Sequence, residues 1–264
     1  MDNADIVKRV MEELGKITSM DDSPAAASSA KITSCGVTEF VGTTEFGETI
    51  GLVIANVDST LQEMIGIDKK YRSLGIIGSR TGAGPQAMAA DEAVKSTNTE
   101  LIMFEMPRDT KIGGGHGTLM VFGADEVSDV RRAVEITLEI LKDFFGEVYM
   151  NDAGHIEVEY TARASSVLAK NFKAPIGKAW GLVASCPAAI GMVMADIAVK
   201  SADVELLMYA SPGKVTSHSN EFMVMFTGDS GAVKQAVLAG RDVGIKLLTT
   251  MGGEPKSAGT PHLS

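Results

Sequence analysis

The chain has 264 residues, a formal net charge of −10 and 45% hydrophobic residues. The acidic balance disfavours nucleic acid and anionic membrane surfaces as partners, because both attract clustered Lys and Arg. No run approaches the roughly 20 apolar residues of a membrane span, and the two cysteines, Cys35 and Cys186, form no CxxC motif. A reducing cytoplasm without a disulfide framework fits these features best.

Residues 1–17 are expected to form an amphipathic helix, because apolar side chains recur there at the spacing of one helix face. These side chains are Ile6, Val7, Val10, Met11, Leu14 and Ile17. Residues 18–36 are mostly small and polar, which predicts a flexible linker. A short helix on such a tether either folds back onto the main domain or docks in a groove of a partner, and the linker favours the partner.

The rest of the chain contains an internal repeat with an offset of 105 residues. The stretch AADEAVKSTNTELIMFEMP (89–107) aligns with MADIAVKSADVELLMYASP (194–212), and the similarity continues in both directions. We therefore expect one domain at 37–146, a second at 147–256 and a short tail at 257–264.

Each copy is predicted to have the same order of elements. In the first copy the hydrophobic pattern predicts strands at 49–55, 73–78, 99–106 and 118–123, and helices at 85–97 and 126–142. Strand, helix, strand, strand, helix is a ferredoxin-like order, with both helices packed on a mainly antiparallel sheet. The opening strand indicates a rotated version, in which an end element has moved to the front. The predicted fold class is α+β, present twice.

The glycine-rich turn Gly78–Gly84 lies between a predicted strand and a helix, and Glu105 ends the next strand. This order loosely resembles a dinucleotide-binding fingerprint, so a nucleotide-binding enzyme is one alternative function. The second copy has SCPAAIG in place of the turn, and the strict GxGxxG spacing is missing, which argues against that site. A small-molecule sensor built from tandem ferredoxin-like modules is another alternative.

Other catalytic or metal chemistry has weak support. The loop KIGGGHG (111–117) leads into a strand, whereas a P-loop leads into a helix. The four histidines, none in an HxxxH or HExxH arrangement, are His116, His155, His218 and His262. We interpret His155 and His262 as hydrogen-bonded surface residues, and Cys186, which has no evident base, as a small buried residue. We therefore expect no catalytic residue, no metal site and no cofactor.

Four long segments carry a resemblance to a known family. They are YRSLGIIGSRTGAGPQAMAADEAVKSTNTE, PRDTKIGGGHGTL, GHIEVEYTARAS and FTGDSGAVKQAV. They closely resemble the B-type shell proteins of propanediol-utilisation bacterial microcompartments, to which the ethanol-utilisation counterpart is similar, and the resemblance covers about residues 37–256. It implies two tandem, circularly permuted microcompartment domains in a non-enzymatic structural protein. Such a protein assembles as a flat, pseudo-hexagonal homotrimer in the microcompartment shell.

The resemblance also implies that one loop of each copy faces a pore. The pore-lining residues would be Lys111, Ile112, Gly113, Gly114, Gly115, His116 and Gly117, and Lys214, Val215, Thr216, Ser217, His218, Ser219, Asn220 and Glu221. The first copy has KIGGG, like the small loop of hexameric relatives, and the second has KVTSHSN. The two loops are therefore not equivalent, and solute could pass inside or between subunits instead.

The family places the lysine of a D-x-x-x-K helix on the tile edge. Asp91 and Lys95 match this spacing in the first copy, and Asp196 and Lys200 match it in the second. Each is an i,i+4 pair on one helical face, and the alternative for each is a solvated salt bridge. The further partners implied are other shell proteins edge to edge, encapsulated enzymes held by the N-terminal helix, and small polar metabolites in the pores.

Overall fold

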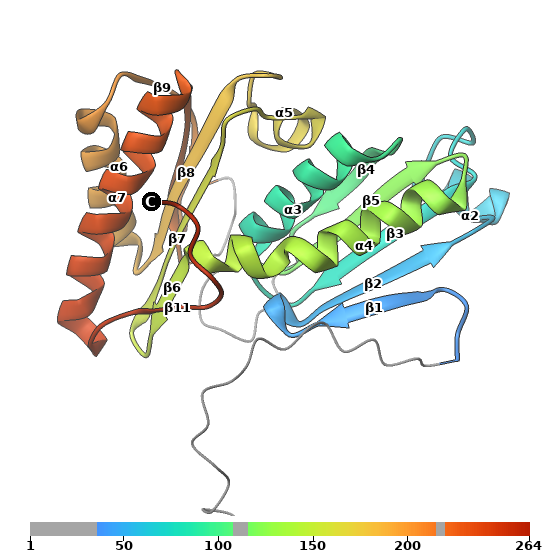
Figure 1. Cartoon of the computed structure of the whole chain (residues 1–264), viewed down its shortest axis with the longest axis horizontal. Coiled ribbons are helices and arrows are strands. Elements are labelled where there is room, and N and C mark those ends of the chain that lie inside the picture. Colours follow the sequence, from blue (N-terminus) through green and yellow to red (C-terminus); the bar gives the residue numbers. More distant parts are fainter. Residues whose placement is uncertain (1–35, 108–115, 215–219) are drawn as a thin grey trace, which may run out of the picture.

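The computed structural model describes residues 36–107, 116–214 and 220–264. The chain forms two α+β units, each an antiparallel sheet with two long helices on one face (Figure 1). The predicted helix at 1–17 and nearly all of the predicted linker lie outside the described residues. Within the described ranges, no helix combines the length and the apolar character that a membrane span requires.

The first unit confirms the predicted α+β order. Its elements are β1 (Phe40–Thr44), the 3-10 helix η1 (Phe46–Glu48), β2 (Thr49–Ile54), α2 (Ser59–Ile65), β3 (Ser73–Ser79), α3 (Ala83–Ser96), β4 (Glu100–Glu105), β5 (Thr118–Ala124) and α4 (Val127–Phe144). The strands form one antiparallel sheet in the order β1-β2-β3-β5-β4. The predicted strands and helices agree with these bounds to within two residues at each end.

The second unit repeats this arrangement. Its elements are the 3-10 helix η2 (Phe145–Glu147), β6 (Val148–Asn151), β7 (Gly154–Thr161), α5 (Ser166–Phe172), β8 (Ala179–Cys186), α6 (Ala188–Ser201), β9 (Val204–Ala210), β10 (Phe222–Gly228), α7 (Ser230–Gly252) and β11 (Lys256–Ser257). The sheet order is β11-β6-β7-β8-β10-β9, so β7-β8-β10-β9 corresponds to β2-β3-β5-β4 of the first unit.

The last residues of the chain pack back onto the start of the second unit. Strand β11 pairs with β6, and the buried Glu147 carboxylate accepts hydrogen bonds from the backbone N–H groups of His262 and Leu263, at 2.6 and 2.7 Å. Leu263 is itself buried against the second unit. The predicted tail at 257–264 is therefore packed against the domain from which it extends.

Helix α3 is buried on two sides, which its small side chains allow. Ala90 and Ala93 pack into the core of the first unit, together with residues of α4 and the first sheet. On its other side, Ala87 and Met88 pack against the second unit, in a separate core that contains Trp180 of β8. Figure 1 shows α3 between the two sheets. This helix therefore joins the two units through apolar contact.

Strand β8 serves both units because its side chains alternate between its two faces. Trp180 and Leu182 point to the core shared with α3, whereas Ala179 and Val183 point to the core beneath α6 and α7. The strand is apolar on both faces, as expected for a strand covered on both sides.

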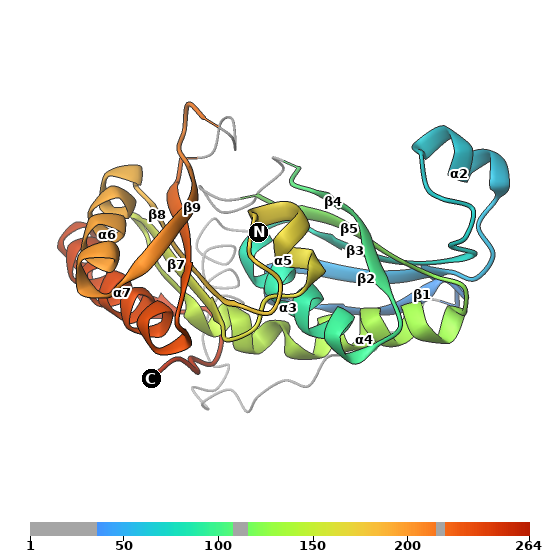
Figure 2. The same ribbon diagram turned by 90° about the horizontal axis from the view of Figure 1, so that it is seen from above.

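Helix α6 occupies the place of α3 in the second unit, but its corresponding face is exposed. Met192 and Val193 are 58% and 42% exposed, whereas Ala87 and Met88, the matching positions 105 residues earlier, are each 1% exposed. Figure 2 shows α6 at the outer end of the molecule, away from the first unit. Among the described residues of one chain, the surface that would cover this face of α6 is therefore missing.

The two D-x-x-x-K pairs lie in different surroundings. The buried Asp91 carboxylate accepts hydrogen bonds from the backbone N–H and the Oγ of Ser165, at 2.9 and 2.5 Å, and pairs with Lys95 Nζ at 2.6 Å. The Asp196–Lys200 pair, at 2.7 Å, has the same spacing on the exposed surface of α6. Asp91 thus ties α3 to the N-terminus of α5 in the second unit.

Replacing each aspartate by asparagine tests this difference. We expect Asp91→Asn to lower the free energy of unfolding by about 1.5–3 kcal/mol, because it weakens hydrogen bonds that a buried charged group accepts. The matched control Asp196→Asn removes only an exposed ion pair and should cost about 0.5 kcal/mol or less. Urea unfolding followed by circular dichroism measures both, and equal losses would contradict the role given to Asp91.

Candidate functional site

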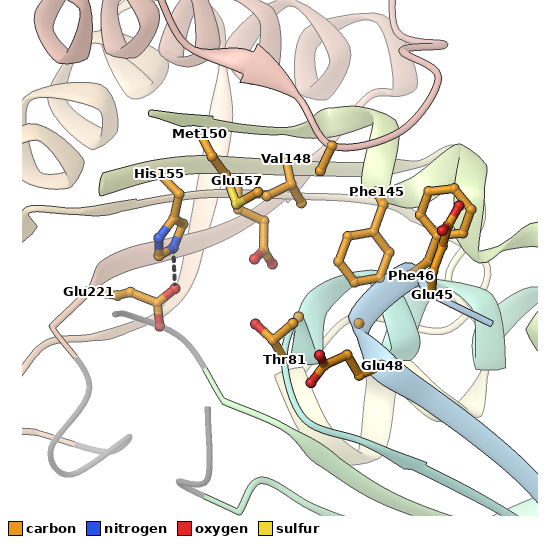
Figure 3. A pocket seen from close by; sticks show the side chains of 13 residues that line it. Glu45, Phe46, Glu48, Thr81, Phe145, Val148, Met150, His155, Glu157 and Glu221 are labelled. Atoms are coloured by element: carbon orange, nitrogen blue, oxygen red, sulfur yellow. Dashed lines mark hydrogen bonds and ion pairs between the residues drawn. The ribbon is translucent and has the colours of Figure 1, made fainter. Parts of the chain in front are cut away.

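A cavity of about 580 Å³ lies where the two units meet. The first unit contributes η1 and the turn between β3 and α3, and the second unit contributes η2, β6, β7, the start of β10 and the C-terminal segment. The lining residues are Glu45, Phe46, Gly47, Glu48, Thr81, Gly82, Phe145, Val148, Met150, His155, Glu157, Glu221 and Ala258 (Figure 3). Four of these side chains are carboxylates, so the cavity is polar and acidic on part of its wall.

Strand β7 presents ionisable side chains to the junction between the units. Ile156 and Val158 point into the core beneath α6 and α7, so His155, Glu157 and Glu159 face the opposite way. All three ionisable side chains are buried. A strand covered on both faces thus carries charge-bearing groups on one of them.

Three of the buried groups lie close together. His155 Nε2 is 2.8 Å from Glu221 Oε1, and one ligand atom from each of His155, Glu157 and Glu221 lies within 4.8 Å of the others. Figure 3 shows the His155 ring directed at Glu221, with the Glu157 carboxylate beside them. Glu221 comes from the start of β10, so the cluster joins the end of the second predicted pore loop to β7.

Burial shifts the pKa values of these groups. Loss of water and the nearby charge of Glu221 together raise the pKa of Glu157 to about 7, although His155 opposes both effects. Burial likewise raises the pKa of Glu159 well above its usual range, with the charge of Glu157 adding to it. Burial alone would lower the pKa of His155, but its hydrogen bond to Glu221 reverses the direction and the pKa is raised.

The described ends of the two predicted pore loops meet near this cluster. His116 and Gly117, at the end of the first loop, are buried, and the His116 carbonyl accepts a hydrogen bond from the N–H of Ala83 at 3.1 Å. A small cavity of about 30 Å³ separates His116 from Glu157 and Glu221. Lys214 and Asn220 are exposed. The remaining predicted pore residues, at 111–115 and 215–219, lie outside the described residues.

The glycines of the turn before α3 are required by close packing. A Cβ on Gly82 would collide with the ring of Phe145, and a Cβ on Gly84 would collide with the carboxylate of Glu157. The cavity beside this turn is lined by acidic groups, which repel phosphate. The nucleotide-site alternative therefore has no support in the structure.

Two expectations about single residues need correction. His155, expected on the surface, is only 6% exposed, because β7 is covered on both faces. Cys186, expected to be buried, is half-buried, and burial raises the pKa of its thiol. His262 lies at the surface as expected, with Nδ1 3.0 Å from the carbonyl of Asp143.

The ionisable cluster was missed because its members are distant in sequence. Glu221 lies 66 residues after His155, so no ligand spacing reveals the pair. The alternation HIEVEY at 155–160 was the available signal, since it places an ionisable group at every second position of a strand. It indicates a functional face once the other side of the sheet is known to be covered.

The predicted edge residues separate into two groups. Asp91 and Lys95 lie at the junction between the units, where Lys95 Nζ also donates to Thr161 Oγ1 at 3.3 Å. Asp196 and Lys200 lie on the exposed face of α6. The predicted partner-binding side chains at 6–17 lie outside the described residues.

Comparison with known proteins places both units in one family. The model of the BMC domain matches residues 73–152, which run from β3 of the first unit into β6, and residues 179–252, which run from β8 to the end of α7. The chain is 52% identical over 254 residues to the bacterial microcompartment shell protein PduB of Citrobacter freundii, which covers 96% of this chain and 94% of the relative. It is 56% identical over 224 residues to PduB of Salmonella typhimurium, with coverage of 85% and 83%.

Solved structures agree with this assignment. A trimeric bacterial microcompartment shell protein PduB superposes with a TM-score of 0.83 at 50% identity, covering 86% of this chain and all of that one. EtuB from Clostridium kluyveri gives a TM-score of 0.82 at 52% identity, covering 86% and 99%. With a BMC domain in each of two permuted units and relatives similar over most of its length, this chain belongs to the tandem-domain shell proteins of bacterial microcompartments.

Proposed function

We propose that three copies of this chain form a flat, pseudo-hexagonal tile of a microcompartment shell. The tile encloses an enzyme core, confines a volatile or toxic intermediate such as an aldehyde, and lets small polar metabolites pass. The proposal rests on the duplicated units and on the similarity to a trimeric shell protein. The relatives described above are shell proteins, so the nucleotide-binding enzyme is not supported.

One observation supports the trimer. The face of α3 that packs against the second unit is buried, whereas the corresponding face of α6 is exposed. Met192 and Val193 need a covering sheet, and the first unit offers one. Ile50 of β2 is partly exposed and occupies the position that Glu157 has in β7. Ile50 pairs with Gly78 of β3 and Glu157 pairs with Ala184 of β8, and Gly78 and Ala184 match in the internal repeat. A head-to-tail contact between α6 and this apolar face closes into a ring. Three chains of two units fill six positions.

The trimer can be tested at Met192. We expect Met192→Asp to convert the trimer into monomers, because it places a charge in an apolar contact. Met251→Asp is the matched control, since Met251 is similarly exposed at 55% but lies at the far end of α7, outside the surface that corresponds to the α3 junction. Sedimentation velocity gives the oligomeric state, and a Met192→Asp protein that stays trimeric would contradict this interface.

The tile edge is proposed to use the exposed pair on α6. Asp196 matches Asp91, which is committed to the junction inside the chain, so Asp196 would lie beside the contact between chains. Lys200 is 69% exposed and its ammonium group can reach a neighbouring tile, whereas Lys95 is only partly exposed. Lys95 remains a candidate for the edge through its ammonium group. We expect the edge contacts between tiles to be small, so that loss of one lysine reduces array formation before it affects the trimer.

Lys200→Ala should therefore reduce the formation of flat arrays while leaving the trimer intact. Negative-stain electron microscopy of purified tiles measures the arrays, and sedimentation measures the trimer. Lys69→Ala, which removes an equally exposed lysine that lies after α2, is the matched control. Arrays that are unchanged in Lys200→Ala would remove this residue from the edge.

The helix predicted at 1–17 is proposed to hold encapsulated enzymes, as the apolar stripe in its sequence and the linker predicted at 18–36 favour partner binding. Deleting residues 1–34 should leave the trimer unchanged and release cargo enzymes from the shell. Co-sedimentation of enzymes with purified compartments measures retention. Retention equal to that of the full chain would assign the helix another role.

Passage of small polar metabolites is proposed to use the pore loops at 111–117 and 214–221. The cavity between the units offers a second route inside each chain, because its wall contains Glu221 at the end of the second loop as well as residues of η1. The carboxylates on part of this wall can accept hydrogen bonds from solutes that carry hydroxyl groups.

A further inference from the structure

The cluster of His155, Glu157 and Glu221 is buried beside the junction between the units. These residues are 6%, 8% and 2% exposed. Glu157 makes no hydrogen bond to another described residue. Among the described residues that line the two cavities around the cluster, none is Lys or Arg. A buried carboxylate such as that of Glu157, which has no cationic partner among the described residues, is costly and would be stabilised by a bound cation.

A second observation points to a ligand at the same place. His116 is only 5% exposed, and neither of its ring nitrogens has a hydrogen-bond partner among the described residues. It lines the small cavity that Glu157 and Glu221 also line. Buried polar groups are normally hydrogen-bonded, and an orphaned imidazole facing two carboxylates is explained by a bound ion with its water.

We propose that His155, Glu157 and Glu221 bind one divalent transition-metal ion of the zinc class in each chain. One imidazole nitrogen and two carboxylate oxygens are ligands that zinc accepts, whereas Mg²⁺ and Ca²⁺ prefer oxygen alone. Binding of the ion would displace any proton held by Glu157 or His155, and the two charges of a divalent ion would then balance the two carboxylates.

The geometry needs little change to hold the ion. Zinc–ligand bonds of about 2.0–2.1 Å in a tetrahedron place ligand atoms about 3.4 Å apart. His155 and Glu221 already lie closer than this, at 2.8 Å, and the three ligand atoms lie within 4.8 Å. Glu157 has to move by about an ångström, and no hydrogen bond to a described residue restrains its carboxylate. Gly84 leaves the space in which that carboxylate lies.

The ion would clamp the end of the second loop to β7 and keep its fourth position open to the cavity. Open positions of this kind hold water or an oxygen atom of a small solute. The site occurs once in each chain, because Ile50 replaces Glu157 at the matching position of the first unit. The inference does not depend on the trimer, since all three ligands belong to one chain.

The test uses the full-length protein, stripped with a chelator and dialysed against Zn²⁺ in the presence of excess Mg²⁺. Metal content by mass spectrometry should give one Zn²⁺ per chain. Glu157→Gln and Glu221→Gln preserve side-chain shape and should each weaken binding by at least about tenfold, since even an outer-sphere partner is worth that much. Thermal stability should rise with Zn²⁺ in the wild type and less in these variants.

Two controls separate this site from incidental binding. Glu159→Gln alters a buried carboxylate on the same face of β7 but outside the cluster, and His262→Gln removes a surface imidazole. Both variants should bind Zn²⁺ as the wild type does. Zn²⁺ binding that is absent in the wild type, unchanged in Glu157→Gln, or lost in His262→Gln would overturn the proposal.

Co²⁺ provides a readout that does not need a variant. Bound in place of Zn²⁺ in the wild-type protein, it should give the intense visible absorption of a tetrahedral site. Should Glu157→Gln fail to fold, this spectrum decides: absorption typical of hexaaqua Co²⁺ would exclude the site.

Discussion

Helix α3 is packed between two sheets, and the small side chains on its surface bring the backbones of the two units close together. Ala87 and Met88 fill one side and Ala90 and Ala93 the other, so the helix belongs to two cores at once. The same contact positions Gly84 against Glu157 and Asp91 against Ser165. The cavity, the buried cluster and the difference between the two D-x-x-x-K pairs all follow from this one packing arrangement.

Duplication explains why a single chain is incomplete. The second copy has α6, which matches α3. Within one chain, however, the first unit, whose sheet would cover α6, lies at the other end of the molecule (Figure 2). The two kinds of junction also differ in chemistry, since Glu157 lies at the one inside the chain and Ile50 at the position that would serve the one between chains. The two junctions can therefore have different roles in one tile. The charged junction inside each chain would bind an ion or solute, and the apolar junction between chains would serve assembly.

Much of the fold could be predicted because the local patterns agree with the final structure. The apolar stripe of α4 and the aligned repeat place its strands and helices to within two residues. The surroundings of individual residues could not be predicted, because they depend on the other copy. Asp91 and Asp196 share a motif, yet only Asp91 meets Ser165. His155 seemed a surface residue for the same reason, since its burial is caused by elements that are distant in sequence.

A structure of the assembled tile by electron cryomicroscopy would show whether a neighbouring chain covers α6. We expect three chains in a ring, with Met192 and Val193 of each α6 buried against the β2 face of the neighbouring chain that carries Ile50. A ring in which this face of α6 remains exposed to solvent, or a tile built from another number of chains, would contradict it.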